Sequence, residues 1–512
     1  MGISRRSFLG GVAGAGLLGS VGGLEALARL RPVSAAESVV TPEMVRFTPE
    51  IEPIVRLIEE TPRDKCVEVM ANALRKGMTY RQFLAALFLA GIRNVSPQPP
   101  GFKFHCVFVI HSCNYLSRMG PPEERYLPLF YALDDFKNSQ EQDVAQGDFV
   151  LAPVKGTLPT GQAAWIEFHA AMKDWDEPRA DRAITALVRE KDPEEVFEGL
   201  WEFGARDYRN LGHKMIFVAH ARRTLQAIGW EHAEPTMRSL ILGLLDFGRD
   251  EVVNKYAFED QEYIANAKLA GDALGRLPGD WAAMEGDAAV VEDLLAPLRE
   301  GKTVEACRLA VELLEAGRCK AGAVWDAAHL AGGELMMRQP GIAGLHTLTS
   351  GNSMQYAFLS AKNPETRLLL LLQGLAWMSQ FRNFMDPRRD KNVRITEVEA
   401  AKIPRSPEKA TEEILSAIST DRADAAAKAF AFDRRFGGAD KLFDGARRLV
   451  FTKCTEHHQY KWPAAIFEDY RIVSPEWRPH MAATAMYYLR GTGHPDSPVI
   501  ERALDELRTV EV

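Results

Sequence analysis

The stretch Ile342–Arg367, IAGLHTLTSGNSMQYAFLSAKNPETR, decides the fold class of this chain. It predicts a helix, a short turn and a second helix. Asn363 is a good N-cap, Pro364 suits the first helical position, and Glu365 favours the positive end of the helix dipole. The second helix continues as LLLLLQGLAWM, which is apolar almost all round and is therefore expected to be buried. Paired helices of this kind indicate an all-α protein.

The first helix of this stretch has a face of small and polar residues. His346, Thr349 or Ser350, Ser353 and Ala357 follow one another at helical spacing. Beside a buried helix, such a face either lines a pocket or forms a close helix–helix contact. On the first interpretation, His346 is a candidate catalytic residue, and Thr349 and Ser353 are candidate substrate-binding residues.

The N-terminus carries a twin-arginine export signature, Ser4–Leu9, followed by a small-residue apolar run from Leu9 to Leu24. The run is short for a membrane span, and cleavage is expected at Ser34–Ala36, with Ala26–Ala28 as a rival site. Residues 1–36 are therefore predicted to be a signal peptide, with an uncleaved anchor as the alternative. The protein is expected to meet the twin-arginine translocase, to reach the periplasm or the exterior, and to keep no transmembrane span.

Composition describes a large, acidic, globular chain. Its 512 residues are 46% hydrophobic and 26% charged, with a formal net charge of −8. Loss of residues 1–36 removes four arginines and one glutamate, which makes the chain more acidic. Nucleic acid and anionic membrane are therefore not expected partners. The six cysteines show neither CxxC nor CxxCH spacing, so free buried thiols are favoured over disulfides or attached haem.

The segment 37–150 is predicted to be an N-terminal helical region. Proline residues and the cap-like Thr79 indicate three short helices within 42–92. Lys103–Met119 has the apolar density of a strand or a buried helix, and its length and helical surroundings favour a helix. Gly147–Thr160 is rich in Gly and Pro and is the best domain boundary in the chain.

The rest of the chain shows a weak internal repeat. Segments beginning at Ile184, Asp293 and Glu413 share a helix, a tight turn and a second helix that ends at Gly. A histidine-bearing helix and then a Pro-started helix with an arginine follow each segment. The histidine–arginine pairs are His220 and Arg238, His346 and Arg367, and His457 and Arg478, at separations of 18, 21 and 21 residues.

The repeat predicts an array of helical hairpins, forming one large helical domain or two closely packed ones. Repeats 1 and 2 occupy 161–390, and repeat 3 occupies 405–512, after a polar linker at Val393–Ser406. General resemblance among amphipathic helices is the alternative explanation.

Matching positions in the three repeats make His220, His346 and His457 candidate catalytic residues that converge on one cavity. Tyr208–Gly229 is predicted to be one helix with His213 and His220 on the same face. They stand about 10.5 Å apart along its axis, so they cannot share a metal but would line one groove, with His213 binding substrate.

Lys461 follows His457 at i+4. In an apolar pocket or near a cation its pKa would be lowered, and it would act as a base or orient an oxyanion. A lysine that extends its ammonium to solvent at a helix end is the alternative.

Two pairs of possible metal ligands have i, i+3 spacing, Asp326 with His329 and Cys454 with His457. Whether a metal binds is left open. The chain has no HExxH, no ExxH pair of the di-iron type and no GxSxG elbow. Zincin, ferritin-like and α/β-hydrolase assignments are therefore disfavoured.

Three short segments resemble the questin oxidase-like family. They are HKMIFVAHA (His213–Ala221), HTLTSGNSMQYAF (His346–Phe358) and HHQYKWPAA (His457–Ala465), within Asp192–Arg490. The second segment looks like the family's His-x-x-Thr element, and the third looks like its His-then-Lys helix.

The resemblance implies an all-helical enzyme that performs a Baeyer–Villiger-like oxygen insertion on a polycyclic aromatic ketone, with NADPH as reductant. Carried over, His220, His346, Thr349, His457 and Lys461 would line its pocket. An exported protein has no NADPH supply, which puts the reductant in doubt. The competing class is a non-enzymatic helical-repeat scaffold that binds a partner or an envelope component on a concave face.

Overall fold

The structure, a computed structural model, describes residues 51–247 and 258–508. These residues form helices and loops without a strand, which confirms the predicted all-α class. None of the described helices combines the length and the apolar character that a membrane crossing requires. The predicted signal peptide, residues 1–36, lies outside the described residues.

The N-terminal helices confirm two predictions from the sequence. Thr79 caps its helix with a capping box: its Oγ1 accepts from the backbone N–H of Gln82, whose side chain accepts from the N–H of Thr79. Lys103–Met119 is mainly helical, with the α-helix beginning at His105 after a 3₁₀ turn. The elements are α4 (Ile51–Glu60), α5 (Arg63–Arg75), α6 (Tyr80–Asn94), η1 (Phe102–Phe104), α7 (His105–Met119), η2 (Pro122–Glu124) and α8 (Leu127–Gln146).

A long loop over residues 148–160, as predicted, leads to the second group of helices. Here Tyr208–Gly229 is not one helix as predicted. The α-helix begins at His213, because Asn210 and Leu211 adopt left-handed backbone conformations. The elements are α9 (Gln162–Asp174), α10 (Glu177–Glu190), α11 (Pro193–Glu198), α12 (Trp201–Ala205), η3 (Arg209–Gly212), α13 (His213–Ile228), η4 (Trp230–His232) and α14 (Ala233–Leu244).

The third group contains the hairpin predicted from Ile342–Arg367. Asn363 Oδ1 accepts from the backbone N–H groups of Glu365 (2.8 Å) and Thr366 (3.2 Å), which confirms the predicted cap. The elements are α15 (Phe258–Ala273), η5 (Leu274–Arg276), α16 (Ala288–Arg299), α17 (Thr303–Glu315), α18 (Ala321–Arg338), α19 (Ile342–Ser360), α20 (Pro364–Phe384), η6 (Pro387–Arg389) and η7 (Ile395–Glu397).

The C-terminal group closes the chain, and its last helix packs back on α5 and α8. Of the three predicted Pro-started helices only α20 begins at its proline. Pro475 opens a 3₁₀ turn, and Pro235 lies two residues inside α14. The elements are α21 (Pro407–Ala417), α22 (Arg422–Phe436), α23 (Asp440–Lys453), α24 (His458–Ile472), η8 (Pro475–Trp477), α25 (Arg478–Ala485) and α26 (Pro498–Arg508).

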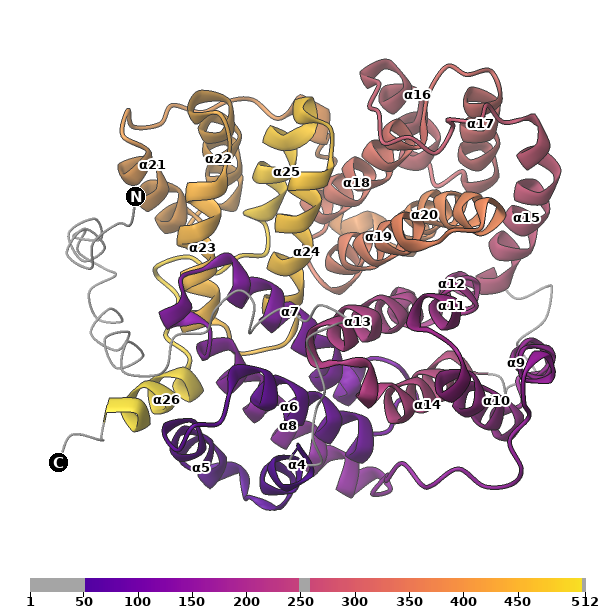
Figure 1. The fold of residues 1–512 in the computed structure, drawn as a ribbon. Coiled ribbons are helices and arrows are strands. Elements are labelled where there is room, and N and C mark those ends of the chain that lie inside the picture. Colours follow the sequence, from indigo (N-terminus) through magenta and orange to yellow (C-terminus); the bar gives the residue numbers. More distant parts are fainter. Residues whose placement is uncertain (1–50, 248–257, 509–512) are drawn as a thin grey trace.

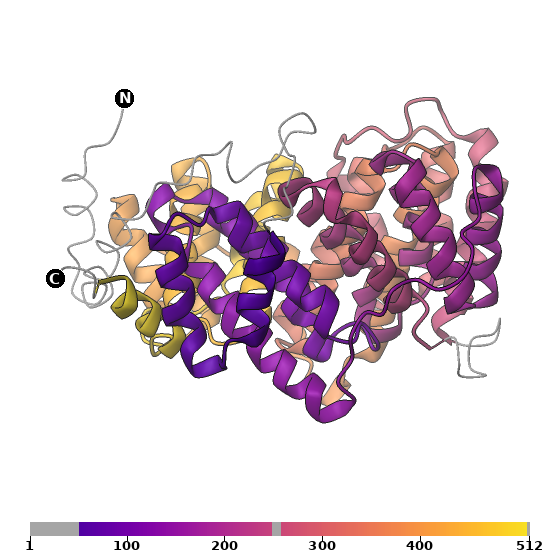
Figure 2. The same cartoon turned by 60° about the horizontal axis from the view of Figure 1, so that its bottom comes forward.

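One helix from each group meets at the centre of the molecule. α7 contacts α13 and α24, and α19 contacts the same two helices, so the four form a closed ring. Their labels lie in the middle of Figure 1, with the four groups around them. In the turned view the indigo N-terminal helices stand in front of the yellow C-terminal ones (Figure 2). The N-terminal helices are therefore packed into the same body as the later ones.

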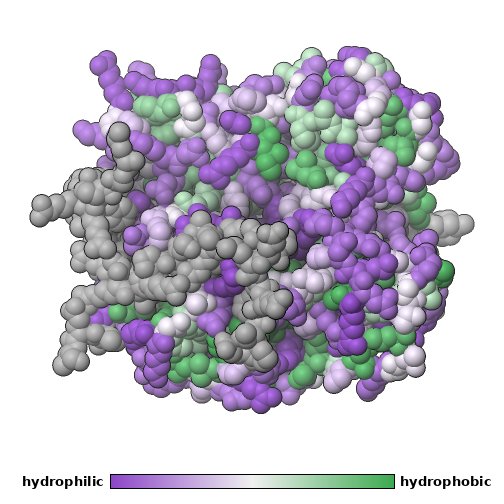
Figure 3. All heavy atoms as spheres, viewed as in Figure 1, coloured by the Kyte–Doolittle hydropathy of each residue, from purple (hydrophilic) through white to green (hydrophobic). Residues whose placement is uncertain are grey.

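Apolar side chains fill the space between the helices, whereas the face shown in Figure 3 is mostly polar with scattered hydrophobic residues. Four tryptophans, Trp201, Trp325, Trp377 and Trp462, are almost completely buried. All six cysteines are buried free thiols, as the sequence predicted. The ring of helices is thus held by a continuous apolar core.

Candidate functional site

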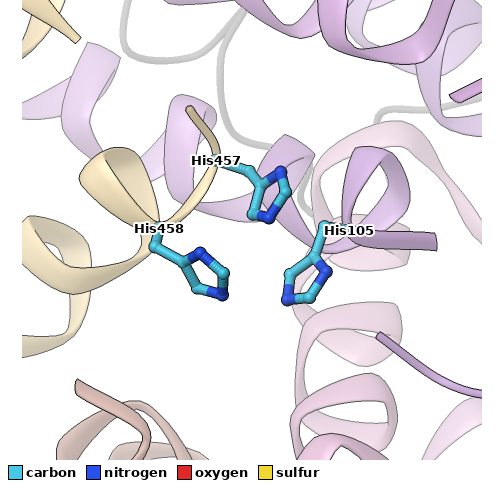
Figure 4. Close-up of side chains that lie close together, drawn as sticks. All are labelled: His105, His457 and His458. Atoms are coloured by element: carbon cyan, nitrogen blue, oxygen red, sulfur yellow. The ribbon is translucent and has the colours of Figure 1, made fainter. Parts of the chain in front are cut away.

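Five histidines converge inside the ring of helices. His105 and His213 are the first residues of α7 and α13, and His346 is the fifth residue of α19. His457 and His458 stand at the N-terminus of α24. Because each histidine lies at the N-terminal end of its helix, the four ends bring their imidazoles together. Figure 4 shows His105, His457 and His458 facing one another.

The ring nitrogens of these histidines are close enough to share one cation. His213 Nε2 lies 2.9 Å from His105 Nε2 and 3.0 Å from His346 Nε2. The His105 and His457 rings stack with centroids 4.1 Å apart, and His458 lies 4.7 Å from His105 and 5.2 Å from His346. Two triads therefore share His105, and within each triad one nitrogen per residue lies within 4.8 Å of the others.

The Nδ1 atoms of the same histidines point at oxygen acceptors. His105 Nδ1 donates to Phe102 O and His346 Nδ1 donates to Ile342 O, each at 2.7 Å, and His213 Nδ1 donates to Asn210 O. This assignment follows from the acceptors, since a carbonyl oxygen carries no proton.

The two remaining histidines face carboxylates. His458 Nδ1 donates to Glu456 Oε2 at 2.9 Å, and His457 Nδ1 lies 3.5 Å from Asp135 Oδ1. A second ring nitrogen held by a carbonyl or carboxylate is the usual support of a metal-binding histidine. The Nε2 atoms of the four histidines whose Nδ1 is hydrogen-bonded, His105, His213, His346 and His458, are thus left with a lone pair available to a metal.

Burial keeps most of these imidazoles neutral. His346 is 1% exposed, and burial lowers the pKa of His105, His213 and His346 well below the usual range. Burial also lowers the pKa of His458 to about 4. Although burial opposes it, the hydrogen bond from His458 lowers the pKa of Glu456 to about 2, so this support is a carboxylate. Neutral imidazole is the form that binds metals.

The Nε2 separations indicate a particular coordination geometry. At a metal–nitrogen distance of about 2.0–2.1 Å, two ligands lie about 2.9 Å apart at a right angle and about 3.4 Å apart in a tetrahedron. The observed 2.9 and 3.0 Å fit the right angle. Without a cation the facing lone pairs would repel one another. The arrangement therefore fits a metal with right-angled ligand pairs, as in square-planar or octahedral coordination.

A left-handed turn sets the position of His213. Asn210, Leu211 and Gly212 have φ values of 54°, 56° and 81°, which leaves the Asn210 carbonyl facing the imidazole of His213. Left-handed backbone at a residue other than glycine costs about 1–3 kcal/mol and persists where surrounding contacts impose it. This strained turn fixes the orientation of the His213 imidazole.

Lys461 lies one helical turn beyond the histidines of α24. Its side chain is 1% exposed, and its Nζ has no hydrogen-bond partner among the described residues. Burial lowers the pKa of Lys461 to about 7, as the sequence predicted for an apolar pocket. The lysine is thus able to take up or release a proton near neutral pH.

Of the three repeat histidines, His346 and His457 belong to the cluster, whereas His220 lies farther along α13. The His220 ring stands 4.6 Å from that of His111, and its Nδ1 donates to Phe108 O at 2.9 Å. Thr349 and Lys461 line a small cavity together with these two histidines. The predicted set of His220, His346 and His457 therefore contains residues from two neighbouring sites, the histidine cluster and the small cavity.

Hydroxyl groups on the polar face of α19 donate hydrogen bonds to backbone carbonyls of the same helix. Thr349 Oγ1 donates to Leu345 O at 3.2 Å and Ser353 Oγ donates to Thr349 O at 3.0 Å. Thr349 still reaches the small cavity, but Ser353 is fully buried and does not line it. Of the two predicted substrate-binding residues, only Thr349 therefore lines a cavity given for the described residues.

Neither predicted ligand pair joins a set of three ligands in the part of the chain that is described. Asp326 Oδ1 accepts from the backbone N–H of Ser474 at 3.0 Å. His329 instead lies 3.5 Å from Asp469 and 2.8 Å from Gln355 Oε1. Cys454 Sγ donates to Gln459 O at 3.5 Å, and burial raises its pKa well above the usual range. These contacts give structural roles to Asp326, His329 and Cys454, whereas His457 belongs to the histidine cluster.

Sequence reasoning missed His105 and His458. His105 stands in the apolar segment FHCVF and belongs to no motif, so only its place in the fold reveals it. The doublet His457-His458 was visible in the sequence, and two adjacent histidines before a helix are a signal of a shared site.

The fold and the site define an all-α protein with a buried histidine centre at the junction of four helices. No family model, curated protein or solved structure matches the chain significantly.

Proposed function

We propose that this protein is a metal-dependent oxidoreductase that oxidises an aromatic or polycyclic small molecule. The metal ligands in this proposal are His105, His213, His346 and His458, with His457 at the more exposed side. The observation that carries the proposal is the convergence of five imidazoles, four of which are hydrogen-bonded to an oxygen atom through Nδ1, while Nδ1 of the fifth lies near a carboxylate.

The ligand type supports a redox metal. Imidazole suits zinc, copper, iron and nickel, and the right-angled Nε2 separations disfavour the tetrahedral geometry of structural zinc. Iron or copper at this place would supply dioxygen binding and electron transfer, which protein side chains do not offer.

The chain's own groups would orient the ligands and handle protons. Carbonyl oxygens of Phe102, Asn210 and Ile342 fix three imidazoles. Lys461, with a pKa of about 7, would donate a proton to a developing oxyanion or withdraw one from the substrate. Burial of the cluster keeps bulk water away from these steps.

The resemblance to questin oxidase-like proteins agrees with this proposal, since His346, His457 and Lys461 of the resembling segments lie in or beside the cluster. The scaffold alternative called for exposed, scattered histidines, and the buried, close cluster favours an enzyme. Export by the twin-arginine route fits a protein that folds around its metal before transport. The proposal assigns no role to NADPH.

Oxygen uptake tests the proposal. Protein loaded anaerobically with ferrous or cuprous ion is mixed with oxygenated buffer and a panel of polycyclic aromatic ketones. Mass spectrometry then follows the products. We expect substrate-dependent oxygen consumption by the wild type and its loss in His105→Ala and His346→Ala. Equal consumption by the wild type and both variants would overturn the proposal.

A further inference from the structure

The four helices of the ring run in the same direction, away from the histidine cluster. Their first residues form the cluster, residues one or two turns later line a small inner cavity, and later residues line an outer groove. On α13, His213 belongs to the cluster, His220 lines the inner cavity and Gln226 lines the outer groove. At 1.5 Å per residue, Arg222, the first groove residue of α13, lies about 13.5 Å along the helix axis from His213.

The outer groove has the size and lining of a small-molecule site. Its volume is about 930 Å³, within the usual range for ligand pockets. Aromatic side chains supply much of its wall: His111, Tyr115, Phe197, Trp230 and Tyr356. The lining carries equal numbers of basic and acidic side chains, Arg118, Arg222, Arg223 and Lys362 against Asp192, Glu194, Glu231 and Glu468. Such walls suit a flat, unsaturated molecule.

The inner cavity adjoins the groove, since His111 and Arg223 line both. Its volume is about 10 Å³, close to what one water-sized group occupies. Arg223 lies where the two cavities adjoin: it pairs with Glu468 at 2.9 Å and packs 3.9 Å from the centre of the Tyr356 ring. A ligand in the groove therefore reaches the inner cavity with one atom or small group.

Three buried polar groups at the inner cavity have no hydrogen-bond partner among the described residues. They are His111 Nδ1, Ser112 Oγ and Lys461 Nζ, in side chains that are 8%, 1% and 1% exposed. Each unpaired buried group costs about 1–3 kcal/mol. Because all three unpaired groups belong to residues that line one cavity, they indicate a bound group that forms hydrogen bonds with them.

All three groups are able to donate a hydrogen bond. Arg223 Nη1 donates to His111 Nε2 at 3.1 Å, so the proton of this neutral imidazole is on Nδ1. A serine hydroxyl and a lysine amine donate as well, the amine in either protonation state. The cavity therefore favours an oxygen that accepts several hydrogen bonds.

We propose that the groove and the inner cavity together bind an aromatic oxyanion, a carboxylate or a phenolate. Its oxygen accepts from His111, Ser112 and Lys461, and its ring lies in the groove against the aromatic wall. Lys461 stands three residues after His458, so the bound oxygen lies about one helical turn from the histidine cluster. The meaning of this site for catalysis rests on the proposed oxidation, whereas binding itself requires no metal.

Calorimetric titration of the metal-free, full-length protein tests the site. The probe is 1-naphthoate, and the comparison is 1-naphthylmethylamine, which has a similar ring system and a cationic donor head. We expect saturable binding of naphthoate and much weaker binding of the amine. His111→Phe and Ser112→Ala should each weaken naphthoate binding about tenfold, since each removes one donor. His480→Phe, at a histidine of α25, is the matched control and should bind like the wild type.

Three results would overturn the inference: no naphthoate binding at millimolar concentration, equal binding of the amine, or unchanged affinity in both donor variants. Circular dichroism establishes that each variant is folded, and Ser112→Ala, which removes one oxygen atom, provides the test if His111→Phe does not fold. His346→Ala separates the two proposals, because it should lose the metal and keep naphthoate. Naphthoate binding without metal uptake by the wild type would contradict the proposed function alone.

Discussion

At the scale of single residues, the partner of each Nδ1 decides what its histidine is able to do. A carbonyl or carboxylate hydrogen-bonded at Nδ1 leaves Nε2 as the free ligand atom, and this holds for four histidines of the cluster, His105, His213, His346 and His458. His329 is different, because an acceptor faces each of its nitrogens. Although burial opposes it, Asp469 raises the pKa of His329. Buried histidines of this chain therefore differ in the direction of their pKa shift, which is downward for His105, His213, His346 and His458 and upward for His329.

Replacing His346 by Ala should separate metal binding from folding. The substitution removes one ligand, so we expect metal affinity to fall by at least about tenfold to a hundredfold, the range seen when only a supporting residue is lost. The free energy of unfolding without metal should fall by no more than about 1–3 kcal/mol, as for many core substitutions. Isothermal titration and urea unfolding measure the two quantities. A variant that keeps full metal affinity and loses stability would identify a core histidine.

The stability of the metal-free protein should depend on pH through the buried neutral histidines. Burial lowers the pKa of His105, His213 and His346 below the value of about 6.5 that they regain on unfolding. Below pH 6.5 the unfolded state therefore binds more protons, and stability falls as pH falls. His329 has the opposite sign, since its raised pKa stabilises at low pH and this contribution is lost as pH rises through it.

The pH dependence of stability that these buried histidines cause is measurable by urea unfolding between pH 6.5 and pH 5. Each neutral buried histidine contributes about 1.4 kcal/mol per pH unit in this window. His105→Gln should reduce the slope by about that amount, because glutamine does not titrate. An unchanged slope in this variant would show that His105 is not held neutral in the folded protein.

At the scale of elements, helix N-termini and the turns before them build the site. Three turns, at Phe102, Asn210 and Ile342, present a carbonyl to the histidine three or four residues later. Phe102 itself has a φ of 47°, so two of these turns contain left-handed residues other than glycine. The site depends on backbone conformation as much as on the histidines.

Gly212→Ala tests that dependence. Gly212 has a φ of 81°, and an added Cβ would lie 2.7 Å from Ser350 Cβ and 2.8 Å from Trp377 Cζ3. We expect a loss of about 2 kcal/mol or more in the free energy of unfolding and weaker metal binding, because the turn orients His213. Gly275→Ala is the control, since its Cβ meets nothing within 4 Å. Equal stability of the two variants would contradict the role of the turn.

At the scale of the whole molecule, local patterns predicted helices but not their meeting point. Caps at Thr79 and Asn363 and the apolar run of α20 were visible because they depend on neighbours in sequence. The left-handed turn at Asn210 could not be predicted from the sequence, since nothing in its residue types requires it. His105 was not predicted as a site residue, because α7 meets α13 and α24 only through tertiary packing. Ligands contributed by four distant segments are assigned by the fold alone.

Export is also a property of the whole chain, and it rests on Arg5 and Arg6 before the apolar run. Changing both to Lys should leave the protein in the cytoplasm, since the translocase reads the arginine pair. Immunoblots of cytoplasmic and periplasmic fractions measure this. Equal periplasmic amounts of variant and wild type would contradict the predicted signal.

The proposed metal site at the four helix ends is tested by elemental analysis combined with X-ray absorption of protein purified from a twin-arginine-competent host. We expect about one iron or copper per chain with mainly nitrogen ligands at about 2.0–2.1 Å. A folded His105→Ala, His213→Ala double variant should lose that metal. A wild-type protein that holds no metal even after anaerobic loading, or a double variant that holds as much as the wild type, would contradict it.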